Sequence, residues 1–134
     1  MSPWSWPVRV YYEDTDAGGV VYHANYLRYL ERARTEGLRQ LGYSQQQLRD
    51  AAGVLFVVVS CSMEFKQPAR LDDLLEVRSN VRLTGAASLE FVQDIYRQGD
   101  APVLLVTATV RVACLESASY RPSRLPASLR KEFI

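Results

Sequence analysis

Hydrophobic and polar positions alternate with two different periods along the chain, which separates one long helix from several strands. From about Ala24 to Leu41 the apolar positions are spaced by four, three, four and four residues, which is typical of one face of an amphipathic helix. This stripe consists of Tyr26, Leu30, Ala33, Gly37 and Leu41. The pattern therefore predicts a single long helix in the first third of the chain.

Two glycines and a serine refine this helix. Gly42 predicts its end, and Ser44 is a candidate cap for a second, shorter helix that reaches about Ala52. Gly37 lies in the middle of the long helix, where glycine costs roughly 1 kcal/mol relative to alanine. We therefore expect Gly37 to pack closely on a sheet.

Elsewhere the period is two, which predicts strands. A short strand is expected over Val8–Tyr12, followed by the turn-rich segment Glu13–Gly19. Four longer strands are expected over Val57–Phe65, Leu75–Leu83, Leu89–Arg97 and Val103–Leu115. In the first of these, one apolar face is expected to comprise Val57, Val59, Cys61, Met63 and Phe65. The last strand is almost entirely apolar and is expected inside the sheet, and a short helix is expected over Ala127–Phe133.

These elements predict an α+β fold in one domain, residues 1–134. Short connections between the strands imply antiparallel neighbours, and one long helix packed on one antiparallel sheet is an α+β layer architecture. Cys61 is expected in the core, because it lies on the apolar face of its strand. The length of 134 residues suits a single domain with a substantial core.

Composition narrows the range of functions. The net charge is +1, from sixteen basic and fifteen acidic residues, so no excess charge favours nucleic acid or stable insertion into a membrane. The N-terminal segment lacks a cationic start and an apolar signal core, and no apolar run approaches a membrane span, so a cytoplasmic protein is expected. Cys61 and Cys114 are widely separated and the chain has one histidine, so we expect no metal site and no cofactor.

The densest cluster of reactive side chains lies in Tyr12–Tyr26, between the first strand and the long helix. It places Asp14 and Asp16 shortly before a helix N-terminus, whose free N–H groups and dipole attract developing negative charge. Such a pair suits acyl transfer, because the carboxylate activates water or attacks directly while amides stabilise the oxyanion. The alternative is that both aspartates only bond nearby amides in a turn, with His23 a polar residue near the helix start.

The run Asp16–Tyr26, which reads Asp-Ala-Gly-Gly-Val-Val-Tyr-His-Ala-Asn-Tyr, resembles the signature of hot-dog thioesterases of the 4-hydroxybenzoyl-CoA thioesterase type. The similarity continues through Tyr29–Glu36 and Phe65–Asp73. It looks closest to the bacterial subgroup called Tol-Pal-associated acyl-CoA thioesterases. The resemblance implies a hot-dog fold, a five-stranded antiparallel sheet wrapped around one long helix, and hydrolysis of an acyl-CoA to free acid and coenzyme A.

The resemblance also implies roles for individual residues. It makes Asp16 the catalytic general base or nucleophile, with His23 as a further catalytic candidate. A backbone amide near Tyr22 or His23 would polarise the thioester carbonyl. Substrate contacts are expected from Gly19, Tyr22, Asn25 and Ser88, although Ala86 and Ala87, just before Ser88, depart from the more polar stretch common in relatives.

Several charged residues have weaker signals. Lys66 and Arg70 are candidates for coenzyme A phosphates, although arginines and lysines on strands are more often simply solvated. Glu31 and Glu36 are possible bases on the helix, but their spacing favours ion pairs, including one between Arg32 and Glu36. We expect Asp16 to carry the chemistry.

Two other functions remain open from the sequence: a hot-dog hydratase or dehydratase, and a non-catalytic partner that binds acyl-CoA or acyl-carrier protein. Acyl-carrier protein is also a candidate substrate of the enzyme itself. A homodimer, or a tetramer built from two dimers, is expected, because one helix over a five-stranded sheet leaves exposed strand edges. The resemblance agrees, since hot-dog thioesterases pair their sheets edge to edge.

Overall fold

The long helix forms where the four-and-three spacing predicts it. In the computed structural model, which describes residues 1–134, α1 spans Asn25–Gln40 and buries Tyr26, Leu30 and Ala33 of the predicted stripe. The chain leaves the helix through Gly42, whose φ of +90° is a conformation that glycine adopts without strain.

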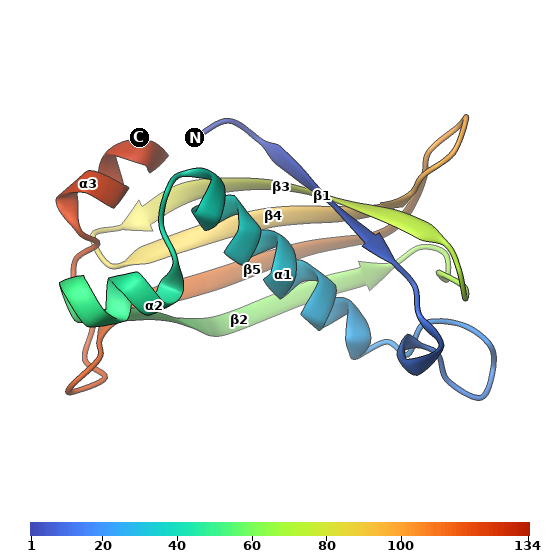
Figure 1. Cartoon of the computed structure of the whole chain (residues 1–134), viewed down its shortest axis with the longest axis horizontal. Helices are drawn as coiled ribbons and strands as arrows, with labels where there is room; N and C mark the ends of the chain where they lie inside the picture. Colours follow the sequence, from blue (N-terminus) through green and yellow to red (C-terminus); the bar gives the residue numbers. More distant parts are fainter.

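Two short helical pieces follow, as predicted. The hydroxyl of Ser44 accepts a hydrogen bond from the backbone N–H of Gln47 and so caps α2 (Gln45–Gln47). The chain then continues into one further helical turn, η2 (Leu48–Ala52). Together α2 and η2 cover one end of the sheet (Figure 1).

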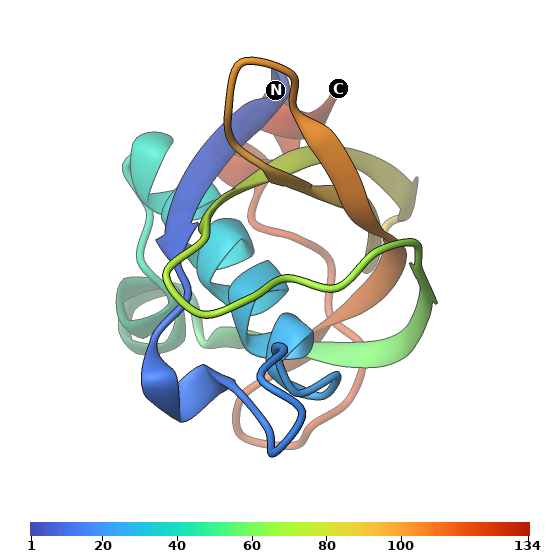
Figure 2. The same cartoon turned by 90° about the vertical axis from the view of Figure 1, so that its right-hand side faces the viewer.

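Five strands form one antiparallel sheet in the order β1-β3-β4-β5-β2. Their bounds are β1 (Trp4–Arg9), β2 (Val54–Phe65), β3 (Leu74–Gly85), β4 (Ser88–Arg97) and β5 (Val103–Glu116). Seen end on, the strands curl around α1 (Figure 2). The α+β prediction is confirmed, β5 is an interior strand as expected, and β1 and β2 are the two edges of the sheet.

The first strand begins and ends earlier than the predicted Val8–Tyr12. It pairs with β3 from Trp4 to Arg9, and the chain then turns into a short 3-10 helix, η1 (Tyr12–Asp14). Trp4 fixes this register, because its buried indole N–H donates to the carbonyl oxygen of Ala33, 2.8 Å away. The two-residue period cannot reveal this contact between distant parts of the chain.

The expected single apolar face of β2 is wrong. A bulge between Val58 and Ser60 shifts the pairing with β5, so that Val57 lies on the face opposite to that of Cys61 and Phe65. Cys61 is exposed rather than in the core, and Phe65 is 53% exposed. The reason is that α1 packs on β1 and β3 and leaves the inner face of β2 uncovered.

Buried polar groups tie the middle of α1 to the sheet. The side chain of Gln93 on β4 is fully buried, and its amide N–H group donates to the carbonyl oxygen of Leu30 (3.1 Å) and the hydroxyl of Ser79 (3.0 Å). Its carbonyl oxygen accepts from the guanidinium of Arg34, 3.0 Å away. Every hydrogen-bonding group of Gln93 is thus used, which fixes the lateral position of the helix.

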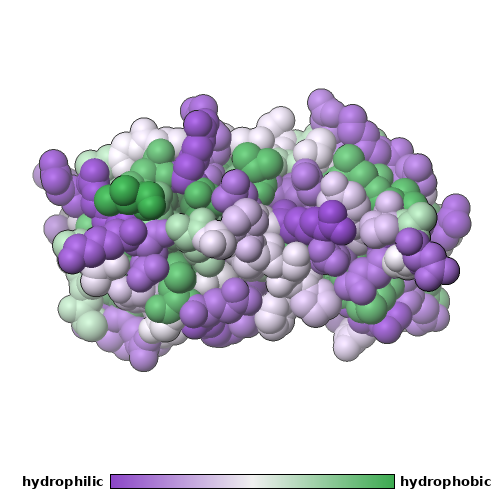
Figure 3. Space-filling model, turned by 90° about the horizontal axis from the view of Figure 1, so that it is seen from above, coloured by the Kyte–Doolittle hydropathy of each residue, from purple (hydrophilic) through white to green (hydrophobic).

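On the outer side of α1, Glu36 pairs with Arg39 one turn later, not with Arg32 as predicted. The distal end of the chain forms α3 (Ala127–Arg130) and η3 (Lys131–Phe133), within the predicted helix Ala127–Phe133. The side of the molecule that carries β1, viewed from above, is mostly hydrophilic with small separate hydrophobic patches (Figure 3). None of the helices is both long enough and apolar enough to cross a bilayer.

The contact between Gly37 and Trp4 gives a stability test. A Cβ atom at position 37 would lie 2.5 Å from two ring carbons of Trp4, so Gly37→Ala must displace the indole and strain its hydrogen bond. We expect a loss of about 1–3 kcal/mol in the free energy of unfolding, typical of overpacking, in spite of the better helix propensity of alanine. Gly99→Ala, where a Cβ meets nothing within 4 Å, is the control for urea denaturation. Equal stability of Gly37→Ala and wild type would contradict the packing argument.

Candidate active site

The loop between β1 and α1 folds back on itself in a tight turn. The backbone N–H of Asp16 donates to the carbonyl oxygen of Val20 (2.9 Å), and the N–H of Gly19 donates to the carbonyl oxygen of Asp16 (3.0 Å). Gly19 has a φ of +79°, a left-handed conformation that favours glycine. Thr15 and Val21 pair across the base of the turn, so the loop holds Asp16 in a defined position.

The carboxylate of Asp16 is exposed and only half engaged. Its Oδ1 accepts a hydrogen bond from the N–H of Gly18 at 2.8 Å, and its other oxygen has no hydrogen-bond partner in the chain. A Cβ atom on Gly18 would lie 3.2 Å from Oδ1, tighter than nearly all real contacts. Gly18 is thus a site residue that our sequence reasoning missed, although an aspartate followed two residues later by glycine is a recognisable turn signal.

The second aspartate of the loop, Asp14, has a different environment. Its side chain is buried, its Oδ2 accepts from the N–H of Tyr11 (2.8 Å), and its Oδ1 accepts from the side-chain amide of Asn25 (2.8 Å). The hydroxyl of Tyr29 is also buried, and burial together with the nearby Asp14 carboxylate raises the pKa of Tyr29. Asp14 therefore joins the end of β1 to the first turn of α1, while Asp16 faces solvent.

Free backbone amides lie at the start of α1. The N–H of Tyr22 donates to the carbonyl oxygen of Asp14, 2.9 Å away, and is therefore occupied. The N–H groups of His23 and Ala24 make no hydrogen bond within the chain. They point with the positive end of the helix dipole, a suitable environment for an anion. Of the two amides predicted to polarise a carbonyl, only that of His23 is free.

A cavity of about 300 Å³ opens beside Asp16. It is lined by Asp16, Val20, Val21, His23, Tyr26, Phe65, Lys66, Gln67 and Pro68. The ring of Phe65 contacts Tyr26 (centroids 5.7 Å apart) and presents an edge contact to His23 (6.4 Å), which forms an apolar wall. The segment after β2 is anchored over α1 because the N–H of Ala69 donates to the hydroxyl of Tyr26 at 3.1 Å.

The cavity brings together some of the predicted residues but not all. Asp16, His23 and Lys66 line it, although the ammonium of Lys66 is paired with Glu64 at 2.9 Å. Gly19 and Tyr22 are exposed on the adjoining loop. Arg70 is exposed outside the cavity, and its backbone pairs with Val20.

Two predicted substrate contacts lie elsewhere. Asn25 is buried and donates to Asp14, so its amide is not available at the cavity. Ser88 lies in the turn between β3 and β4, at the opposite end of the sheet, where its hydroxyl accepts from that of Thr84. Ser88 can approach an Asp16 cavity only if that cavity belongs to another copy of the chain.

The arrangement suits attack by water on a carbonyl group. A carboxylate oxygen without a partner can accept a proton, free amides can stabilise an oxyanion, and the wall formed by Tyr26 and Phe65 can hold an apolar group.

Comparison with known proteins gives a consistent result. The family model described as the thioesterase-like superfamily matches residues 10–133. The acyl-CoA thioester hydrolase YbgC of Escherichia coli O6:H1 is 49% identical over 128 residues, which cover 96% of this chain and 93% of that protein. Among solved structures, a probable thioesterase from Bartonella henselae is 36% identical with a TM-score of 0.85, over 93% of this chain and 100% of that one.

A 4-hydroxybenzoyl-CoA thioesterase in complex with 4-hydroxybenzoyl-CoA shares the fold. It has a TM-score of 0.90 at 20% identity and covers 98% of this chain and 99% of its own. The hot-dog fold predicted from the sequence is thereby confirmed.

The different environments of the two aspartates predict different effects on stability. Asp14→Ala leaves the N–H of Tyr11 and the buried amide of Asn25 without an acceptor, so we expect a loss of about 2 kcal/mol in the free energy of unfolding. Asp16→Ala, at an exposed position, should change it by no more than about 0.5 kcal/mol. Chemical denaturation of the two variants measures both values. A larger loss for Asp16→Ala than for Asp14→Ala would mean that the structural and exposed acids have been assigned the wrong way round.

Proposed function

The chain is an enzyme of the thioesterase-like superfamily, and from this membership we propose that it hydrolyses acyl-CoA thioesters to a free acid and coenzyme A. The observation that supports this most strongly is the half-engaged carboxylate of Asp16, held by Gly18 at the mouth of a cavity with an apolar wall. A name shared with relatives gives the activity, and the geometry of this loop gives the residue.

We propose that Asp16 acts on the thioester carbonyl carbon. As a general base, it takes a proton from a water molecule whose oxygen bonds to that carbon; as a nucleophile, it bonds to the carbon itself and water hydrolyses the resulting anhydride. In both routes the carbon–sulfur bond breaks, the thiolate leaves and is protonated, and the acid is released. The free oxygen of Asp16 serves either route.

The oxyanion is assigned to the start of α1. The N–H of His23 has no acceptor in the chain, and it stands where the helix dipole favours negative charge. The imidazole of His23 lines the same cavity and is placed to orient the substrate or the water. The acyl group is assigned to the wall of Tyr26 and Phe65 and to the uncovered inner face of β2.

We propose that the working unit is a homodimer joined at β2. The β1 edge is only six residues long and contains Pro7, a device that discourages edge pairing. The β2 edge is twelve residues long and contains no proline, and Val58 and Val59 are 50% and 61% exposed on it. A second copy adding its own β2 satisfies these backbone groups and covers these side chains.

The catalytic assignment predicts a specific loss of turnover. Asp16→Asn removes the basic and nucleophilic oxygen while keeping the size of the side chain, so kcat for acyl-CoA hydrolysis should fall at least ~10²-fold. Binding of acyl-CoA and the stability should remain. Release of thiol from short, aromatic and long acyl-CoAs, followed with a thiol reagent, measures the effect.

Glu13→Gln is the matched control, because Glu13 is an exposed acid on the same loop that does not line the cavity. It should keep wild-type turnover. If wild-type protein releases no thiol from any acyl-CoA, the proposed activity is wrong; if Asp16→Asn keeps its turnover, the assigned residue is wrong.

The proposed dimer predicts a mass of twice the 15.2 kDa chain at micromolar concentration in sedimentation equilibrium. Val59→Lys places a charge on the β2 edge and should shift the equilibrium toward the monomer with loss of activity. Ser5→Lys, at an exposed position of the β1 edge, should leave the mass unchanged. A fully active wild-type species of 15.2 kDa would exclude the dimer as the working unit.

A further inference from the structure

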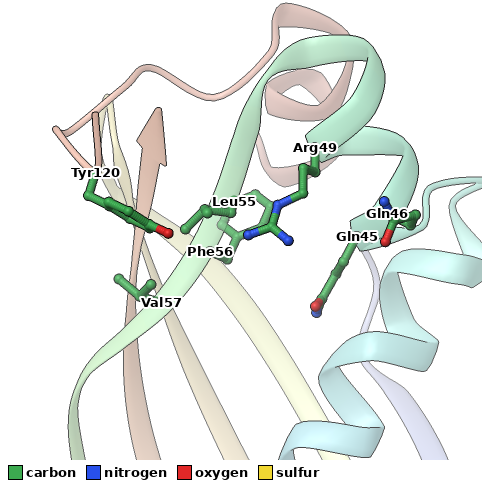
Figure 4. A pocket seen from close by; sticks show the side chains of 7 residues that line it. All are labelled: Gln45, Gln46, Arg49, Leu55, Phe56, Val57 and Tyr120. Atoms are coloured by element: carbon green, nitrogen blue, oxygen red, sulfur yellow. The ribbon is translucent and has the colours of Figure 1, made fainter. Parts of the chain in front are cut away.

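A second cavity, of about 390 Å³, lies at the end of the sheet opposite to Asp16. It is lined by Gln45, Gln46, Arg49, Leu55, Phe56, Val57 and Tyr120. Gln45 and Arg49 reach from α2 and η2 toward β2, and Tyr120, from the loop after β5, lies on the other side of that strand (Figure 4). None of these residues takes part in the chemistry assigned to Asp16.

The cationic group of this cavity is unpaired. Arg49 is exposed and forms no salt bridge anywhere in the chain. The neighbouring acid, Asp50, instead accepts hydrogen bonds from the side-chain amide of Gln46 at 3.1 Å. An arginine with all its donors free suits a phosphate group, because its planar guanidinium binds two phosphate oxygens at once.

The aromatic group of the cavity is held in an unusual way. Tyr120 has a φ of +58°, which is uncommon for any residue other than glycine, and its side chain is 65% exposed. Strain of this kind persists where the surrounding structure imposes it and is often found at binding sites. An exposed ring beside a free arginine offers a stacking face for a heterocyclic base together with a phosphate contact.

Within one chain this cavity is remote from Asp16. Leu55 lines one cavity and Phe65 lines the other, and ten residues of β2 at about 3.3 Å each separate them by about 33 Å along the strand. Pairing of two β2 strands changes this relation. If two copies of Val54–Phe65 overlap along their whole length in the antiparallel sense, Val54 of one copy lies opposite the partner's Phe65.

The antiparallel overlap therefore places the Arg49 cavity of one copy beside the Asp16 cavity of the other. Ser88 lies at the same end of the sheet, since Val57, Ala113 and Ser88 are successive neighbours across β2, β5 and β4. The predicted role of Ser88 in substrate binding, which is impossible within one chain, is consistent with this arrangement.

We propose that the cavity of Gln45, Arg49 and Tyr120 binds the phosphorylated adenosine end of the coenzyme A whose thioester lies in the partner's Asp16 cavity. This assignment rests on the proposed acyl-CoA hydrolysis and adds the partner-derived subsite. Arg49 contacts phosphate, the ring of Tyr120 stacks on the adenine, and each dimer has two such composite sites.

Two substrates separate this subsite from the catalytic machinery. For acyl-CoA, Arg49→Gln should raise KM about 10-fold, the effect of one charge-assisted contact, with kcat unchanged. For the same acyl group on pantetheine, which lacks the nucleotide, Arg49→Gln should change nothing. Tyr120→Ala should give the same pattern, and Arg130→Gln, on α3 outside the cavity, is the control. Equal effects on both substrates, or none on either, would overturn the assignment.

Calorimetry with coenzyme A itself keeps the test independent of turnover. Arg49→Gln should weaken binding of coenzyme A about 10-fold and leave binding of pantetheine unchanged. If wild-type protein hydrolyses no acyl-CoA but shows this difference, the proposed activity fails while the nucleotide subsite stands. If the binding of coenzyme A does not depend on Arg49, the subsite fails whatever the activity.

Mixed dimers test whether the subsite acts across the interface. One chain carries Asp16→Asn and the other Arg49→Gln, with different tags so that the heterodimer can be purified. If each site combines Asp16 of one chain with Arg49 of the other, one site has both residues intact, and the heterodimer shows the wild-type KM with about half the wild-type kcat. If both residues act within one chain, only the raised KM of Arg49→Gln is observed, which would overturn the proposal.

Discussion

One helix has to cover a sheet that is much longer than the helix itself. The sixteen residues of α1 span about 24 Å, whereas the fourteen residues of β5 span about 46 Å. Other segments therefore close the two ends of the sheet, the Asp16 loop at one end and α2 with η2 at the other. Across the strands, α1 packs on β1 and β3, and the inner face of β2 stays open.

Both cavities follow from this constraint. Because α1 begins part-way along the sheet, the preceding loop has to fold over the end of β2, and this places Asp16 and the free amides of His23 and Ala24 at the rim of a hollow. At the other end the short helices cannot fill the space beside β2, which leaves Arg49 at the edge of a second hollow. The buried carboxylate of Asp14 keeps the loop attached to the helix, so that Asp16 is free for chemistry.

The sequence predicted the elements and the Asp16 loop because local signals determine them. The stripe on α1, the glycine at 42 and the cap at Ser44 depend on neighbours within a few residues, and all three were predicted correctly. Contacts between distant segments were not accessible in this way. Trp4 meets Gly37 and Ala33 only in the folded chain, so the bounds of the first strand were wrong.

The errors at the site have the same origin. The bulge at Val59 changes the face of the following residues, and neither it nor the limited reach of α1 is visible in a two-residue period, so Cys61 was placed in the core. The resemblance named the loop residues together, but only the fold separates the buried Asp14 and Asn25 from the exposed Asp16. It also places Ser88 at the far end of the sheet.

The most direct test of the account is a crystal structure of Asp16→Asn with a bound acyl-CoA. The account predicts the thioester carbon beside position 16, with its carbonyl oxygen facing the N–H of His23 and the acyl group against Tyr26 and Phe65. An acyl-CoA whose thioester lies away from this cavity, for example along the solvent-facing side of α1, would contradict it.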